Sequence, residues 1–175
     1  RSRLEWEKGI DRLIDIWLSV HNTHPDWVLD IYGQGMLQDE LQQKIIAANA
    51  GTYIHLKGSS PDIMYEYLNC SLLVLTSRYE GFPMALLEAM ACGVPCVTYD
   101  CPFGPRSMIT NMRNGILVEE GDKKEMVDKI NYLIENEKNR KKIGTNARKY
   151  VLQYSQKNIM DKWNILFNNC LTITS

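Results

Sequence analysis

Short apolar segments alternate with longer segments of helical periodicity along most of this chain. The apolar segments, which we expect to be strands, are 27–32, 53–56, 71–76, 95–99 and 115–118. The helical segments are 7–23, 36–50, 62–68, 83–92, 106–111, 122–136, 138–153 and 156–170. Strands that alternate with helices predict a mostly parallel sheet with helices on both faces. We therefore expect an α/β, Rossmann-like fold.

Length and charge limit the domain count and the kind of partner. A chain of 175 residues with 45% hydrophobic content supports one domain with a substantial core. Its net charge of −1 argues against nucleic-acid binding, which depends on clustered Lys and Arg. No apolar stretch approaches the ~20 residues that span a bilayer, and no signal peptide is evident. We expect a small-molecule partner and no transmembrane segment.

The five cysteines form an odd set without a Cys-x-x-Cys pair. A zinc site would need two close pairs or added histidines, and the three histidines lie far from the cysteines in sequence. No Asp-x-Asp motif is present to hold Mg²⁺ or Mn²⁺. We therefore expect a reduced, cytoplasmic setting and no metal.

Two glutamates frame the most informative stretch, which follows the expected strand 71–76. It reads EGFPMALLE, from Glu80 to Glu88. Gly81 and Pro83 predict a turn and the first helical residue, so a buried strand leads into a helix N-terminus. Free backbone N–H groups and the helix dipole favour phosphate oxygens there. Glu88 lies among apolar neighbours, where an ionised carboxylate needs hydrogen-bond donors that ligand hydroxyls would supply.

This stretch resembles the Glu-seven-residues-Glu signature of nucleotide-sugar glycosyltransferases with the GT-B fold, specifically the retaining group called family four or group 1. Further segments agree with that family in order and spacing, namely Arg3–Leu4, Lys8–Gly9, Ile31–Gly35 and Asn114–Val118. The resemblance covers nearly the whole chain. It implies one half of a GT-B enzyme, with residues 1–155 as the nucleotide-sugar-binding domain and 156–175 as a C-terminal helix that packs on an N-terminal domain.

The resemblance also implies roles for the matched positions. The implied catalytic residues are Glu80, which holds sugar hydroxyls, and Lys8 and Arg3, whose charges neutralise the departing diphosphate. Glu88 would accept both ribose hydroxyls. The implied donor-binding residues are Glu88, Gly81, Phe82, Pro83, Met84, Lys57 and Gly33. The plainer alternative is a solvated lysine beside a glycine and two glutamates at a loop end and a helix edge.

The implied activity is transfer of a hexose or N-acetylhexosamine from a nucleoside-diphosphate sugar, usually UDP and less often GDP, with retained configuration. The product would be a surface polysaccharide or glycoconjugate, no cofactor would be needed, and the acceptor glycan or glycolipid would bind the N-terminal domain. We expect this chain alone to be nearly inactive. A UDP-sugar epimerase, which shares the GT-B architecture, and a non-catalytic nucleotide-binding module are the alternatives.

The sequence departs from the family in two places. Ser2 occupies the position of the family's glycine, and the strand before it is expected to be truncated. Ser107 stands where many relatives carry Glu, so the role of the loop 101–107 stays open. The basic cluster 138–142 is expected to be a solvated helix face, with peripheral contact to an anionic membrane as its alternative.

Overall fold

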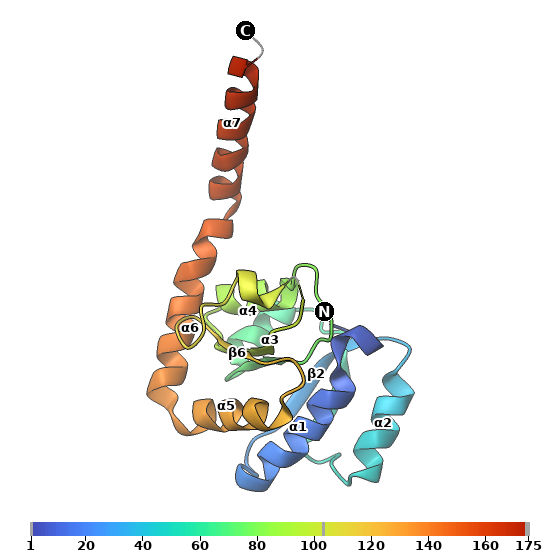
Figure 1. The fold of residues 1–175 in the computed structure, drawn as a ribbon. Helices are drawn as coiled ribbons and strands as arrows, with labels where there is room; N and C mark the ends of the chain where they lie inside the picture. Colours follow the sequence, from blue (N-terminus) through green and yellow to red (C-terminus); the bar gives the residue numbers. More distant parts are fainter. Residues whose placement is uncertain (1, 103, 174–175) are drawn as a thin grey trace.

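The structure, a computed structural model, describes the backbone of residues 2–102 and 104–173 and the side chains of residues 4–102 and 104–168. Its elements, with η marking short 3-10 helices, are β1 (Ser2–Arg3), η1 (Trp6–Lys8), α1 (Ile10–Thr23), β2 (Leu29–Gln34), α2 (Gln38–Ala47), β3 (Ile54–Gly58), α3 (Ile63–Asn69), β4 (Leu73–Leu75), α4 (Met84–Ala91), β5 (Cys96–Tyr99), η2 (Pro105–Ser107), β6 (Ile116–Val118), α5 (Lys123–Glu135), α6 (Glu137–Val151), η3 (Leu152–Tyr154) and α7 (Gln156–Ile173). Helices lie between the main strands in sequence and pack around them in space (Figure 1). The α/β class is confirmed.

The strands form two three-stranded parallel sheets. The first has the order β1-β2-β3 and the second the order β4-β5-β6. Strand β1 contributes two residues, which pair with Gly33 and Gln34 at the end of β2. In the second sheet, Val74 pairs with Val97, and Val97 in turn pairs with Ile116. Every pair is parallel, as the alternation of strands and helices predicts.

The second sheet is covered on both faces because successive residues of a strand point to opposite sides. Val74, Val97 and Ile116 join one hydrophobic cluster, which also contains the apolar faces of α1 and α5. A second cluster, built on α4 and α6, contains Cys96 of β5. Leu73 and Leu75, which flank Val74 in β4, pack against this second cluster. All four residues of β5 are buried. The sequence shows this as a continuous apolar run, typical of a central parallel strand.

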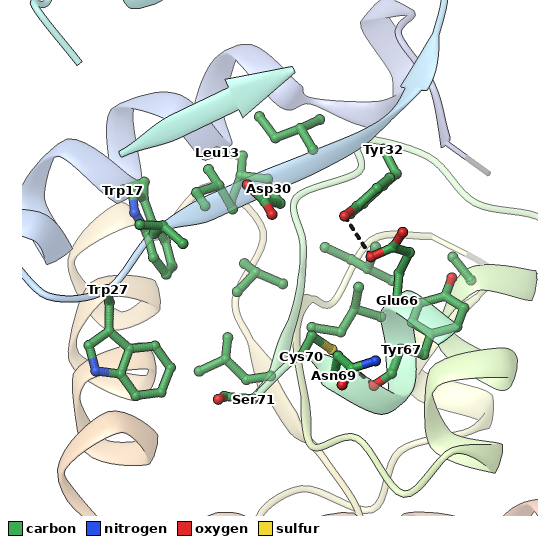
Figure 2. A pocket seen from close by; sticks show the side chains of 18 of the residues that line it. Leu13, Trp17, Trp27, Asp30, Tyr32, Glu66, Tyr67, Asn69, Cys70 and Ser71 are labelled. Carbon is green, nitrogen blue, oxygen red and sulfur yellow. Dashed lines mark hydrogen bonds between the residues drawn. The ribbon is translucent and has the colours of Figure 1, made fainter. Parts of the chain in front are cut away.

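The first sheet is covered differently. Leu29 and Ile31 of β2 are buried against α1, whereas Asp30 is exposed. A cavity of about 520 Å³ is lined by β2 on one side and by β4 on the other. Figure 2 shows its side chains, with Tyr32 donating a hydrogen bond to Glu66 at 2.8 Å. The edge of β2 that faces β4 is therefore open to this cavity.

Local sequence signals explain several helix ends. Asp62 and Asp122 each accept a hydrogen bond from a backbone N–H in the first turn of α3 and α5. The predicted helix 7–23 is wrong in one respect, because Gly9 adopts φ 61° and divides it into η1 and α1. A left-handed residue interrupts a helix, and glycine adopts this conformation without strain.

The C-terminal helix α7 projects away from the rest of the fold (Figure 1). Among its described side chains, several large apolar ones are exposed, namely Met160, Trp163, Ile165, Leu166 and Phe167. Within residues 2–102 and 104–173, we find no helix with the length and hydropathy needed to cross a membrane. The role predicted for 156–175, packing on another domain, stays a prediction.

Candidate donor site

Five of the predicted site residues gather where β4 ends, between η1 and the start of α4. A cavity of about 220 Å³ lies there, and Lys8, Glu80, Phe82, Pro83 and Met84 line it. Strand β4 delivers the loop that carries Glu80, while η1 brings Lys8 from a distant part of the sequence. In an open parallel sheet, ligands bind outside the carboxyl ends of the strands. This cavity lies at the carboxyl end of β4.

Lys8 and Glu80 face each other directly. The Lys8 ammonium donates a hydrogen bond to Glu80 Oε1 at 2.8 Å, and the Ser77 hydroxyl donates to the same oxygen at 2.7 Å. The Glu80 side chain is 11% exposed and that of Lys8 is 24% exposed. A carboxylate that is largely removed from water needs such donors, and a ligand that enters can still reach the lysine.

The start of α4 adds an anion-binding group to the same cavity. Pro83 precedes the first helical residue, and the first backbone bonds of α4 run from Leu86 and Leu87 to the Pro83 carbonyl. No described side chain caps this end. The N–H groups of Met84 and Ala85 precede those bonded groups and belong to the unsatisfied first turn. They lie at the cavity, where the positive end of the helix dipole favours negative charge.

Glu88 lies on α4, is half-buried and is not among the residues that line the cavity of about 220 Å³. The Tyr67 hydroxyl donates a hydrogen bond to Glu88 Oε2 at 3.4 Å. In the described part of the chain, this is the only hydrogen bond that the Glu88 carboxylate accepts. Burial, and then the Glu88 carboxylate, raises the pKa of Tyr67. The tyrosine therefore stays a hydrogen-bond donor at neutral pH, and the carboxylate retains capacity to accept further donors.

The loop before η2 covers Glu80 closely. A Cβ added at Gly104 would lie 2.9 Å from the Glu80 Cβ and 3.2 Å from the Pro83 Cδ. The Ser107 hydroxyl donates to the Gly104 carbonyl at 2.7 Å and so holds this turn. Burial, followed by the Glu80 carboxylate, raises the pKa of the neighbouring Cys101 thiol to about 11. The thiol is therefore neutral at neutral pH.

Other predicted positions lie elsewhere. Gly33 pairs with β1, and Lys57 is exposed, with its ammonium 3.9 Å from Asp30 Oδ2. Gly81 is exposed in the loop after Glu80. The Arg3 side chain lies outside the described residues. The roles of these four positions stay predictions.

Three residues near the site escaped the sequence reasoning. Ser77 and Gly104 contact Glu80, and Arg78 contacts the segment that carries Lys8. Gly104 follows Pro102 by two positions and directly precedes Pro105, and such a loop glycine signals close backbone approach. Ser77 and Arg78 carry no comparable signal, because a serine and an arginine in a loop are usually solvated.

The larger cavity has the wrong charge for a phosphate site. The described ionisable groups that line it are the carboxylates of Asp26, Asp30 and Glu66, with the phenols of Tyr32 and Tyr67 and the thiol of Cys70, and no lysine or arginine is among them. Phosphate binding requires positive charge or free N–H groups. Size alone would select this cavity, and chemistry selects the smaller one. Within residues 2–102 and 104–173, no group of three or more His, Cys, Asp or Glu side chains could hold a metal ion.

Comparison with known proteins agrees with this geometry. The model of the family "Glycosyl transferases group 1" matches residues 2–150. The amylovoran biosynthesis glycosyltransferase AmsD of Erwinia amylovora is 32% identical over 95% of this chain and 46% of its own length. The poly(ribitol-phosphate) alpha-N-acetylglucosaminyltransferase of Staphylococcus aureus is 32% identical over 96% of this chain and 34% of its own.

Solved structures give the same result. TarM superposes with a TM-score of 0.89 at 33% identity, over 95% of this chain and 34% of TarM. The pneumococcal O-GlcNAc transferase GtfA, solved in complex with UDP and GlcNAc, gives 0.87 at 28% identity, over 97% of this chain and 35% of GtfA. Both relatives have the GT-B fold. The chain spans a third to a half of the length of these relatives. It belongs to the group 1 glycosyltransferase family, and it superposes on part of enzymes that have the GT-B fold.

Proposed function

We propose that this chain is the donor-binding domain of a retaining glycosyltransferase. The enzyme would transfer a hexose or N-acetylhexosamine from UDP-sugar to an acceptor hydroxyl, in the synthesis of a surface polysaccharide or glycoconjugate at the cytoplasmic side of the membrane. The observation that carries this proposal is the meeting of Lys8, Glu80 and the uncapped start of α4 at one cavity. Each is a group that a diphosphate sugar requires.

The chemistry assigns one task to each group. When the bond between the anomeric carbon and the diphosphate breaks, the electron pair leaves with the diphosphate. The oxygen of the acceptor hydroxyl bonds to the same carbon, and its proton passes to the departing diphosphate. The Lys8 ammonium and the N–H groups of Met84 and Ala85 stabilise the charge on the leaving group. Glu80 accepts sugar hydroxyls and holds the reacting carbon in place. Lys8 and the helix N-terminus supply positive charge without a metal, so none is invoked.

UDP is the nucleotide that we favour, with GDP second. Glu88 has acceptor capacity beyond the Tyr67 hydroxyl and can take both hydroxyls of a ribose. The relative GtfA was solved with UDP and GlcNAc, which supports the same donor here.

The acceptor side of the site would come from an N-terminal domain. The cavity of about 220 Å³ is smaller than the roughly 300–1,000 Å³ of typical ligand pockets. The exposed apolar side chains of α7 offer a surface on which that domain would pack. We therefore expect the 175-residue chain to bind donor nucleotide and to transfer little sugar.

The first test is calorimetric titration of the chain with UDP, GDP and ADP at equal salt and without metal. We expect UDP to bind, and we expect Glu88→Ala to weaken UDP binding by about 10-fold or more, because hydrogen bonds to a charged group contribute roughly 1.5–3 kcal/mol each. Glu66→Ala is the matched control, since Glu66 also accepts a tyrosine hydroxyl but lines the larger cavity.

The outcomes separate the alternatives. Weakening by Glu88→Ala with little effect of Glu66→Ala supports the donor site proposed here. Weakening by Glu66→Ala alone would move the nucleotide to the larger cavity and contradict the proposal. No binding of any of the three nucleotides to a folded chain, checked by circular dichroism, would count against donor binding by this domain.

A further inference from the structure

Lys8 and Glu80 come from segments 72 positions apart in the sequence. A lysine side chain is long and flexible, and partly exposed Lys–Glu pairs contribute little to stability. Their ion pair is therefore too weak to hold η1 against the loop after β4. Other contacts must set the distance between the two charges.

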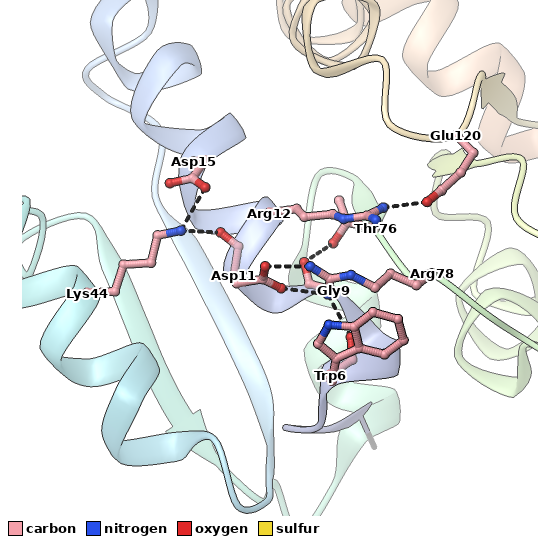
Figure 3. Close-up of polar contacts among 9 residues, drawn as sticks. All are labelled: Trp6, Gly9, Asp11, Arg12, Asp15, Lys44, Thr76, Arg78 and Glu120. Carbon is pink, nitrogen blue, oxygen red and sulfur yellow. Dashed lines mark hydrogen bonds and ion pairs between the residues drawn. The ribbon is translucent and has the colours of Figure 1, made fainter.

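Arg78 supplies the strongest of those contacts. Its backbone N–H donates to the Glu7 carbonyl at 2.8 Å, and its Nη1 donates to the Trp6 carbonyl at 2.7 Å. These two carbonyls belong to the residues that immediately precede Lys8. Figure 3 shows Arg78 with its partners Trp6 and Asp11. Arg78 lies two positions before Glu80, so it connects the segment that carries Lys8 with the segment that carries Glu80.

Asp11 fixes the Arg78 guanidinium in this position. The two groups form a bidentate pair, with Nη1 2.8 Å from Oδ1 and Nη2 2.6 Å from Oδ2. The guanidinium also lies 4.7 Å from the centre of the Trp6 ring, as Figure 3 shows. A planar guanidinium can make the fork, the carbonyl bond and the ring contact at once, and a lysine cannot. Arg78 lowers the pKa of Asp11, which is consistent with a tight pair.

A second contact joins the same two segments on the other side of Lys8. We call the contacts between residues 6–11 and residues 76–80 the junction. The Thr76 hydroxyl donates to the Gly9 carbonyl at 2.8 Å. A Cβ at Gly9 would lie 2.1 Å from the Thr76 carbonyl oxygen, so only glycine permits this approach. Lys8 is therefore held on both sides in sequence, by Arg78 at residues 6 and 7 and by Thr76 at residue 9.

We propose that Arg78, held by Asp11, is a positioning residue that fixes the Lys8 ammonium against Glu80 and the start of α4, at the distance that a donor diphosphate requires. This inference rests on the proposed donor-binding function. Arg78 acts through Lys8: its guanidinium is engaged by Asp11 and by the Trp6 carbonyl.

The fold offers a closely matched control. Arg140 donates to the carbonyls of Leu133 and Ile134 at 2.7 and 2.9 Å and lies 5.3 Å from the centre of the Trp27 ring. It thus makes carbonyl and ring contacts like those of Arg78, where α5 meets α6 and away from the donor-site cavity, although no carboxylate among the described residues forms an ion pair with it. Loss of Arg140 reports the general cost of removing such an arginine.

The first readout is UDP affinity in a double-mutant cycle. Arg78→Ala is expected to weaken UDP binding about 10-fold, since small misplacements of a site group have large effects. In the Lys8→Met background, the same substitution should change affinity by less than about 2-fold, because the group that it positions is gone. Arg78→Lys should recover little, and Arg140→Ala should leave the affinity unchanged. Equal effects of Arg78→Ala with and without Lys8 would overturn the proposal.

The second readout does not depend on nucleotide binding. Amide hydrogen exchange reports the N–H groups of Lys8 and Gly9, which donate to the Glu5 and Trp6 carbonyls. Arg78→Ala should accelerate exchange at both amides, whereas Arg140→Ala should not. Unchanged exchange in Arg78→Ala would overturn the proposal even if UDP binds. Accelerated exchange in a chain that binds no UDP would support the positioning of Lys8 by Arg78 and would count against the proposed function instead.

Discussion

The two sheets differ in how they are covered and in what they contribute to the site. The β4-β5-β6 sheet is packed on both faces, and the loop and helix after β4 carry Glu80 and Glu88. The β1-β2-β3 sheet has an exposed residue, Asp30, within β2 and an open edge toward the larger cavity. The segment beside it, η1, contributes Lys8. A well-packed half thus supplies the carboxylates, and a less covered half supplies the cation.

This difference shows that the site depends on the junction between the halves rather than on either half alone. The polar contacts across it run from Thr76, Arg78 and Glu80 to Gly9, Asp11 and Lys8. One hydrophobic cluster also crosses it, since Leu29 of β2 and Val74 of β4 both belong to it. Substitutions at the junction should therefore alter binding and stability together. Similar substitutions inside the well-packed half should alter stability alone.

The largest difference is expected between two glycines. Gly9→Ala places a Cβ 2.1 Å from the Thr76 carbonyl oxygen at a residue with φ 61°, and Gly144→Ala places one 2.0 Å from the Gly93 carbonyl oxygen. Each should lower the free energy of unfolding by about 2–4 kcal/mol, measured by urea denaturation. Only Gly9→Ala should also weaken UDP binding, because only Gly9 adjoins Lys8.

The glycine comparison requires affinity to be measured where both variants are folded. Calorimetry at low temperature and without denaturant meets this condition, with circular dichroism as the check. Equal losses of UDP affinity in the two variants would mean that general destabilisation, and not the junction, controls the site.

A smaller difference is expected between two buried threonines. Thr76 Oγ1 donates to the Gly9 carbonyl across the junction at 2.8 Å, whereas Thr98 Oγ1 donates to the Tyr99 carbonyl within β5 at 3.0 Å. Both residues are 1% exposed. Thr→Val at either position should cost about 1 kcal/mol of stability, the usual net contribution of one hydrogen bond. Thr76→Val should in addition raise the UDP dissociation constant a few-fold, and a like change in Thr98→Val would contradict the comparison.

The sequence predicted the strands and long helices of the well-packed half closely, because continuous apolar strands and amphipathic helices leave a clear pattern. The helix predicted over 106–111 is wrong, since only the 3-10 helix η2 (Pro105–Ser107) forms there. The predicted strand 95–99 corresponds to β5, and the predicted helix 83–92 to α4. The pattern reflects burial, which local composition records. The division at Gly9 was missed because it depends on the close approach of Thr76, a residue distant in sequence.

The same reasoning explains what was predicted of the site. Lys8, Glu80, Phe82, Pro83 and Met84 do line one cavity, since a motif at the end of a strand fixes where its residues lie. Arg78 could not be predicted, because its partners Asp11 and Trp6 lie in another segment and a loop arginine is usually solvated. The sequence also gave no reason to expect that Ser107 would bond to the backbone of its own loop.

The smallest expected difference is in stability at acid pH, between an ion pair at the junction and an ion pair on the surface. Arg78 lowers the pKa of Asp11 across the junction, and Lys141 lowers the pKa of Glu137 within one exposed turn of α6. A carboxylate whose pKa in the folded state lies below its ordinary value, 3.8 for Asp11, binds fewer protons folded than unfolded. Its stabilisation is therefore present above about pH 4 and is lost as the pH falls through the folded-state pKa.

Asp11→Asn should consequently flatten the fall of unfolding free energy below about pH 4 more than Glu137→Gln does, because water screens an exposed pair almost completely. Urea denaturation at a series of pH values from neutral to acid checks this, with both variants compared to the unsubstituted chain. If the two substitutions flatten the profile equally, the bidentate pair at the junction is no stronger than a surface pair. The segment that carries Lys8 would then have to be held by the hydrogen bonds that Arg78 and Thr76 donate to its backbone carbonyls. In that case Asp11→Asn would leave UDP affinity unchanged.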